Sequence, residues 1–375
     1  MKTKSLIYAA ACSLILAGAC KSKSTNKTVD SAGIDTTKKD TEATGKIKPT
    51  GPAPEWATGI KPEMQAVIEK LGSYGDKPIE TLTAVEARKN HTPTDAVMDL
   101  MKENNIPKPA LNIDTMGKDI PVDGGKIHIR VYTPKTGKSS YPAIVYYHGG
   151  GFVIANIDVY DASASSLADQ VGAVVISVAY RLAPEHKFPV AHNDAYSAYE
   201  WVVKNAASIK ADPKKIAVAG ESAGGNLALN TAIKARDKGI QQPIHVLAVY
   251  PVAGSNMATP SYVKNANAKP LNKAMMIWFV KNYLNSMAEG KDPRINLIAA
   301  NLTGLPATTI ITDQFDPLQS EGMTLADKLK AAGVSVDSKN YDGVTHEFFG
   351  MGNVVPEAKD AETYSVDQLK KSFGM

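Results

Sequence analysis

The chain has 375 residues, of which 43% are hydrophobic and 21% charged, with a formal net charge of +4. This is an ordinary globular composition with ample material for a core, enough for one large α/β domain or two smaller ones. The first 50 residues carry nine lysines against four acidic residues, so the rest of the chain is close to neutral. A near-neutral body has no electrostatic footprint for nucleic acid, and nucleic-acid binding is excluded on that ground.

The first twenty residues have the pattern of an export signal. Two lysines precede an apolar stretch, Leu6–Leu16, which is too short to span a bilayer. Small residues then precede Cys20, which resembles a bacterial lipoprotein signal in which residues 1–19 are removed and Cys20 is acylated. The alternative is ordinary cleavage that leaves Cys20 unmodified. We expect an exported protein in the periplasm or at the cell surface, held to a bacterial membrane only through a lipidated Cys20.

Both cysteines of the chain, Cys12 and Cys20, lie in this leader. The body therefore has no disulfide and no thiolate metal site. Residues 20–55 are rich in Lys, Thr, Ser, Gly and Pro and contain few large apolar side chains. Such a segment cannot bury enough surface to offset the entropy of ordering it, which predicts a flexible tether.

Residues 56–110 contain two stretches with helical apolar periodicity, at 64–71 and 94–101, and they predict N-terminal cap helices. Residues 112–133 then alternate between apolar and polar side chains around an Asp-Gly-Gly turn. This alternation predicts an antiparallel strand pair.

From residue 142 the chain alternates between strand and helix. Short apolar runs predict strands at 143–147, 173–178, 215–219, 245–249, 308–312 and 334–341. Helical stretches lie at 159–171, 191–206, 223–238, 318–332 and 358–373. Continuous apolar strands separated by helices predict a mostly parallel, doubly wound sheet covered on both faces, so residues 111–375 form one α/β domain.

One long insertion, 255–300, interrupts this rhythm with polar loop and a helix around 273–284. Long insertions between strands are usually functional. We expect it to wall a substrate pocket together with residues 56–95, the alternative being that its apolar side chains are simply the core of an extra helix.

The sequence Gly220-Glu-Ser-Ala-Gly224 joins a β-branched strand to an alanine-rich helix. It matches the nucleophile elbow, a turn so tight that small residues must flank the serine. Ser222 is left beside a helix N-terminus, where the helix dipole and free N–H groups favour developing negative charge. Ser222 is the predicted nucleophile.

A serine hydroxyl needs a base to remove its proton, and the base needs a third group to orient it. Only two histidines follow Ser222 in the chain. His245 starts a strand and is better interpreted as structural. His346 lies in a glycine-containing loop between the last strand and the last helix, where doubly wound sheets place reactive groups, and it is the predicted base. Protonation of this histidine predicts that activity falls below roughly pH 6–6.5.

The triad acid is expected between these two residues. Asp316 follows the strand that ends at Thr312 and precedes a proline that can open the next helix, so it is also an N-cap candidate. Asp313 is the alternative acid. Asp342 is closer to His346 in sequence, but its sequence context is typical of a turn residue.

A second motif, His148-Gly-Gly-Gly-Phe152, follows the first parallel strand. Successive glycines let the backbone approach a ligand and point N–H groups at it. Together with the N–H of Ala223 they predict an oxyanion hole, the alternative being a flexible glycine turn. His148 is expected to brace the loop rather than act as a base.

Four motifs occur in a fixed order: His148-Gly-Gly-Gly-Phe, Tyr180-Arg-Leu-Ala-Pro-Glu-His-Lys-Phe-Pro, Gly220-Glu-Ser-Ala-Gly-Gly-Asn and Asp316-Pro-Leu. From about residue 110 to the C-terminus the chain resembles the bacterial hormone-sensitive-lipase-like (family IV) esterases of the α/β-hydrolase fold. The resemblance implies a helical cap, a preference for short acyl esters, and a triad of Ser222, Asp316 and His346. It also implies oxyanion donors at Gly150, Gly151 and Ala223.

The resemblance further implies that Tyr180, Arg181 and Glu185 buttress the glycine loop. The chain departs from the family pattern at Glu221, at Gln319-Ser320 and at Glu347, which stands where glycine is usual. None of these changes removes a triad atom, but Glu347 alters the wall beside His346.

The expected function is therefore that of a serine carboxylesterase that hydrolyses short-chain esters through an acyl-enzyme, without a metal or another cofactor. One alternative uses the same triad on acetylated carbohydrates or small amides. A more distant alternative is a non-catalytic ligand-binding protein on this fold.

Overall fold

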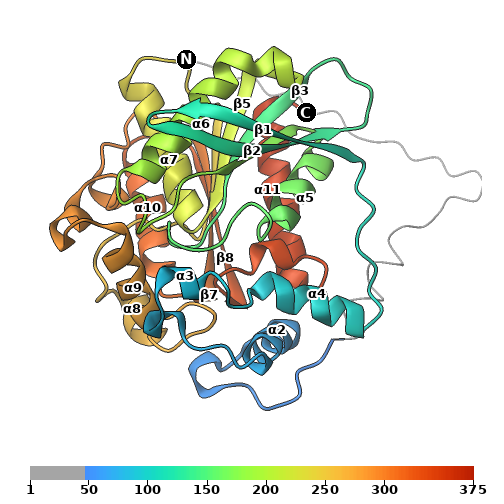
Figure 1. The fold of residues 1–375 in the computed structure, drawn as a ribbon, viewed down its shortest axis with the longest axis vertical. Helices are drawn as coiled ribbons and strands as arrows, with labels where there is room; N and C mark the ends of the chain where they lie inside the picture. Colours follow the sequence, from blue (N-terminus) through green and yellow to red (C-terminus); the bar gives the residue numbers. More distant parts are fainter. Residues whose placement is uncertain (1–46) are drawn as a thin grey trace, which may run out of the picture.

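An eight-stranded sheet runs through the middle of the molecule in the computed structural model, which describes residues 47–375 (Figure 1). The strand order is β1-β2-β4-β3-β5-β6-β7-β8. The strands are β1 Ile113–Val122, β2 Gly125–Pro134, β3 Tyr141–Tyr147, β4 Val174–Ala179, β5 Ala211–Glu221, β6 His245–Val249, β7 Ala307–Phe315 and β8 Val336–Thr345. β3 to β8 pair in parallel, whereas β1 and β2 pair antiparallel and β2 continues antiparallel onto β4. The predicted sheet and its antiparallel strand pair are confirmed.

Two separate cores, one on each face of the sheet, explain the continuous apolar strands. In β3, Ile144 packs into one core and Val145 into the other. The Ile144 face is covered by α5 Asp161–Val171 and α11 Pro356–Phe373, which lie side by side in Figure 1. The opposite face is covered by α6 Val190–Asn205, α7 Ala223–Asp237 and α10 Gln319–Ala331. Because both faces are buried, the strands cannot alternate between apolar and polar side chains.

The remaining short helices gather mainly at the end of the molecule toward which β7 and β8 run (Figure 1). From the N-terminal segment these are η1 Glu55–Ala57, α2 Pro62–Ser73, η2 Ile79–Thr81, α3 Ala84–Ala87 and α4 Pro93–Glu103. The insertion supplies α8 Pro260–Lys264, α9 Lys273–Tyr283, η4 Met287–Lys291 and η5 Leu297–Ala299. Two further turns, η3 Ala206–Ile209 and η6 Phe349–Met351, belong to the α/β body. The indole N–H of Trp278 in α9 donates to the carbonyl of Leu82, 3.0 Å away, and ties the two cap segments together.

Local sequence sets where the cap helices begin. Thr83 before α3 and Thr92 before α4 each accept from the backbone N–H three residues later, and Glu86 and Asp95 return the bond. These capping boxes satisfy amide groups that a helix N-terminus otherwise leaves free.

The N-terminal end of the described chain differs from the expected tether. Ile47 is only 3% exposed. The backbone N–H of Thr50 donates to Glu69 of α2 at 2.6 Å, and the Gln65 amide donates to the carbonyl of Gly51 at 2.8 Å. One buried isoleucine and two polar side chains of α2 therefore order residues 47–54, inside the range 20–55 predicted as tether. The predicted signal peptide, Cys20 and the tether up to residue 46 lie outside the described residues. Between residues 47 and 375, no helix is both long and apolar enough to span a bilayer.

Candidate active site

Ser222 stands at the junction between β5 and α7 in a strained turn. Its φ of 55° and ψ of −116° are rare for a residue with a side chain. A Cβ atom on Gly224 would lie 1.9 Å from the carbonyl oxygen of Tyr147, and one on Gly220 would lie 2.3 Å from the carbonyl oxygen of Gly224. Both positions therefore require glycine, which is the physical reason for the motif.

The structure brings the three predicted triad residues into one hydrogen-bonded chain. His346 Nε2 lies 2.9 Å from Ser222 Oγ, and His346 Nδ1 lies 2.8 Å from Asp316 Oδ2. Asp316 follows β7 and His346 follows β8, so all three side chains meet at the carboxyl ends of neighbouring strands. With Nδ1 donating to Asp316, Nε2 is left to accept the proton of the serine hydroxyl.

Asp316 is oriented by its own loop. Its second oxygen, Oδ1, accepts from the backbone N–H of Leu318 at 2.8 Å, while Asn265 of the insertion donates to its main-chain carbonyl at 2.9 Å. Helix α10 begins only at Gln319, and its N-cap is Leu318. Asp316 is therefore not the N-cap residue itself: it lies two residues before it, and its side chain caps the turn of Pro317 and Leu318 that leads into the helix.

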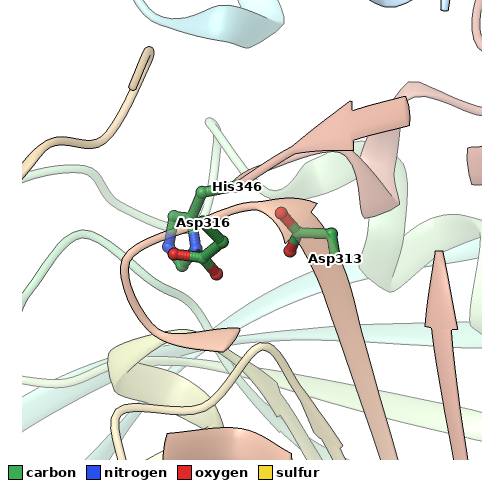
Figure 2. A group of neighbouring side chains, drawn as sticks. All are labelled: Asp313, Asp316 and His346. Atoms are coloured by element: carbon green, nitrogen blue, oxygen red, sulfur yellow. The ribbon is translucent and has the colours of Figure 1, made fainter. Parts of the chain in front are cut away.

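Asp313, the alternative acid, lies at the end of β7 with its carboxyl group facing the Asp316–His346 pair (Figure 2). It is fully buried, and among the described residues neither of its oxygens has a hydrogen-bond partner. Burial, and then the charge of Asp316, raise its pKa well above the ordinary value. Nδ1 of His346 bonds to Asp316 and not to Asp313, so the structure favours Asp316 as the triad acid.

Potential ligand atoms of Asp313, Asp316 and His346 all lie within 4.8 Å of one another (Figure 2). A metal ion would need deprotonated ligands. Here Nδ1 of His346 is already bonded to Asp316, and burial and the charge of Asp316 raise the pKa of Asp313, which disfavours its charged form. The donor set fits a carboxylate–imidazole pair beside a second, buried carboxyl group.

The glycine loop supplies free backbone donors next to Ser222. Gly150 and Gly151 have φ values of 93° and 59°, and a Cβ atom on Gly151 would lie 2.3 Å from the ring of Phe279. Within the described part of the chain, the backbone N–H groups of Gly150, Gly151 and Ala223 donate to no other residue. Both glycines line the same cavity as Ser222, and Ala223 opens helix α7. Such donors suit a negatively charged oxygen.

Comparison with known proteins identifies the family. Residues 144–350 match a family model described as alpha/beta hydrolase fold. A carboxylesterase of Mycobacterium tuberculosis, NlhH, is 37% identical over 71% of this chain and 84% of its own length. An ethyl acetate hydrolase of Pseudomonas putida is 31% identical over 83% of this chain and 99% of its own. The hyperthermophilic esterase of the archaeon Pyrobaculum calidifontis superposes with a TM-score of 0.76 at 36% identity, covering 83% of this chain and 98% of that one.

The chain belongs to the hormone-sensitive-lipase-like (family IV) esterases of the α/β-hydrolase fold.

The other histidines of this esterase near the sheet have structural roles. His245 contacts Thr309 Oγ1 at 3.0 Å and Ser372 Oγ at 2.8 Å, as a buried structural residue should. His148 stacks on Tyr180 with ring centroids 4.2 Å apart, and burial lowers its pKa to about 4. A neutral, stacked His148 braces the glycine loop, as predicted.

The buttress of the glycine loop is only partly the one expected. The hydroxyl of Tyr180 donates to the carbonyl of His148 at 2.8 Å. Glu185 reaches the loop indirectly, because it pairs with Arg88 of the cap, which donates to the carbonyl of Val153 at 2.8 Å. Arg88 lies in none of the four motifs and is 97 residues from Glu185, so this pair could not be predicted from the sequence.

The expectation that Arg181 buttresses the glycine loop is wrong. Arg181 pairs with the buried carboxylate of Asp194 in α6 at 2.7 Å and donates to the carbonyl of Asp123 in the β1–β2 turn. A carboxylate that is 1% exposed needs a cationic partner, and this need directs the guanidinium away from the loop.

A buried polar network near Ser222 also escaped sequence reasoning. His192 contacts the Tyr283 hydroxyl at 2.7 Å and Asn226 Oδ1 at 2.9 Å, and Phe152 stacks on Tyr283 with centroids 4.2 Å apart. The network joins cap helix α9, the glycine loop and the first turn of α7. The sequence pointed to only one member of this network, Asn226, because that residue belongs to the elbow motif.

Both cap segments line a cavity of about 430 Å³ that reaches Ser222 and His346. The prediction that the insertion and residues 56–95 wall the pocket together agrees with this lining. Its apolar walls include Ile68, Leu71, Ile79, Pro270, Leu271, Met275, Met276 and Phe279.

Proposed function

We propose that this esterase hydrolyses short-chain carboxylic esters through an acyl-enzyme formed on Ser222. Carboxylic ester hydrolysis is the activity of its family relatives. The observation that carries the residue assignment is the chain of hydrogen bonds from Ser222 through His346 to Asp316, which opens onto an apolar cavity.

Each step of the reaction uses a group of this site. Nε2 of His346 accepts the hydroxyl proton while Ser222 Oγ attacks the ester carbonyl carbon, and Asp316 stabilises the imidazolium that results. The N–H groups of Gly150, Gly151 and Ala223 receive the tetrahedral oxyanion. The imidazolium then protonates the leaving alcohol oxygen, and water repeats the sequence to release the acid.

The preference for short acyl chains is supported by the size of the pocket. A volume of about 430 Å³ lies at the small end of the range of ligand sites, and part of it must hold the alcohol. The Pseudomonas putida relative is named for ethyl acetate, a short ester.

A series of p-nitrophenyl esters from acetate to palmitate tests this function. We expect kcat/KM to be highest for acyl chains of about two to six carbons and to fall steeply for longer ones, since the excess length cannot be desolvated in the cavity. A maximum at about twelve or more carbons, roughly twice the acyl length that the cavity can hold, would contradict the proposal. Hydrolysis of anilides as fast as esters would instead favour an amidase.

We further propose that the esterase is exported and anchored through an acylated Cys20. The support is the sequence alone: a lysine-bearing start, an apolar stretch and small residues before Cys20. Labelled palmitate should enter the full-length chain in cells and should not enter a Cys20→Ser variant. Equal labelling of both chains would refute the anchor.

A further inference from the structure

Glu347 holds a backbone conformation that favours glycine. Its φ is 72°, although it carries a full side chain. The hydroxyl of Tyr160 donates to both carboxylate oxygens, at 2.7 and 2.6 Å, and the side chain remains 21% exposed in the lining of the cavity. A residue kept in a sparsely populated conformation at an active site points to a role for its side chain.

The carboxylate of Glu347 lies beside the atom that serves the leaving group. Its Oε1 is 3.8 Å from Nε2 of His346, the same nitrogen that faces Ser222 Oγ. In the proposed reaction this nitrogen hands its proton to the alcohol oxygen of the ester. The alcohol part of a substrate must therefore sit next to Glu347.

The titratable groups around this position are acidic, and burial raises the pKa of one of them, Glu221, to about 7. Asp316 is bonded to Nδ1, the other nitrogen of the His346 imidazole. Glu221 is buried nearby and accepts hydrogen bonds from the hydroxyls of Tyr146 and Tyr250. The ring of Tyr250 packs 4.5 Å from that of His346. Burial raises the pKa of Glu347, and the charge of His346 and the Tyr160 hydroxyl oppose that rise.

The basic residues that line the cavity lie on the cap. Arg88 is bonded to Glu185, whereas Lys77 and Lys269 are exposed. Two further acidic residues, Asp76 and Glu80, line the cap side, and Asp76 is bonded to His91. Beside Nε2 of His346, Glu347 is thus a carboxylate that reaches the cavity and pairs with no lysine or arginine among the described residues.

We propose that Glu347 selects esters whose alcohol part carries a positive charge close to the scissile bond. This inference rests on the proposed function. A two-carbon spacer places an ammonium nitrogen about 3.5 Å from the ester oxygen, within reach of a carboxylate that borders the same proton-transfer nitrogen. The reaction is unchanged: water is added across the acyl C–O bond, which yields the acid and a cationic amino alcohol.

Acetylcholine and 3,3-dimethylbutyl acetate form the matched pair that tests the proposal. They share shape and acyl group, and they differ in that a quaternary nitrogen replaces a quaternary carbon. At about pH 8 and low ionic strength we expect the wild-type kcat/KM to favour the cation roughly tenfold, the size of one opposite charge at a partly buried site. The preference should shrink at about 0.5 M NaCl, where the interaction is screened.

Glu347→Gln keeps the size of the side chain and removes its charge, so the ratio for the two esters should fall to about one. Glu347→Gly is a second variant that also removes the charge, and glycine readily adopts the positive φ at this position. The ratio of kcat/KM for the two esters should again be about one. Glu80→Gln removes one charge from the cap side of the same cavity and should keep the wild-type ratio. The neutral ester is the internal reference in every variant, so a general change in rate does not affect the ratio.

Equal kcat/KM for both esters in the wild type would overturn the proposal. So would a cation preference that survives in both Glu347 variants, or one that is lost in Glu80→Gln instead. Failure of the wild type to hydrolyse either ester while it hydrolyses p-nitrophenyl acetate would also overturn this proposal, whereas failure on p-nitrophenyl acetate as well would overturn the proposed function itself.

Discussion

Ser222→Ala is expected to lower ester turnover by about 10⁶, the loss seen when the nucleophile of a serine hydrolase is removed. The substitution deletes only Oγ, the atom 2.9 Å from His346 Nε2, and alanine adds no bulk to the tight turn. Single-turnover and steady-state rates on p-nitrophenyl acetate measure the effect. A phosphonate ester should label the wild type covalently and leave the variant unlabelled.

Ser372→Ala is the matched control. It removes a hydroxyl bonded to the structural His245 at 2.8 Å, so it should cost about 1 kcal/mol of folding free energy while turnover stays near the wild-type value. A Ser222→Ala enzyme that keeps a tenth of wild-type hydrolysis would refute the nucleophile assignment.

Asp316→Asn is expected to reduce kcat by about 10⁴, because an amide in place of the carboxylate favours the wrong tautomer of the imidazole and no longer stabilises the imidazolium. The pH profile gives a second measurement. Burial alone would lower the pKa of His346, but the charge of Asp316, followed by that of Glu347, outweighs it and raises the pKa above the usual 6.5.

The sign of this shift can be tested. Only the neutral imidazole accepts the serine proton, so a raised pKa means that activity is lost at a higher pH on acidification. The wild-type acid limb should therefore lie above the range of pH 6–6.5 expected from the sequence. Asp316→Asn should move it down, because it removes the largest of the effects that raise the pKa.

Asp313→Asn is the control for this prediction. Burial and the nearby Asp316 raise the pKa of Asp313, and neither of its oxygens is hydrogen-bonded to His346, so an amide of the same shape should keep kcat within about tenfold. A loss in Asp313→Asn as large as that in Asp316→Asn would make Asp313 the triad acid.

Much of the fold was readable from the sequence because its signals are local. The apolar run at 143–147 predicts β3 within two residues of its start, and the alanine-rich stretch after Ser222 predicts α7 from its first residue. Strand order, by contrast, depends on pairing between distant segments, and so does the way residues 47–54 pack against α2. The polar composition of that stretch predicted a flexible tether. This prediction was wrong for residues 47–54, because one isoleucine, Ile47, is buried there.

The sequence by itself determined the candidate catalytic residues. Steric limits leave only glycine at 220 and 224, and the chain order of parallel strands brings Asp316 and His346 to the edge of the sheet where Ser222 lies. Only the tertiary structure decided their surroundings: the Arg88–Glu185 pair, the turn of Arg181 toward Asp194, and the Tyr160–Glu347 contact across 187 residues. Backbone periodicity and turn chemistry act over a few residues, whereas the direction of a long polar side chain is set by whichever buried charge or hydroxyl the packed fold brings within reach.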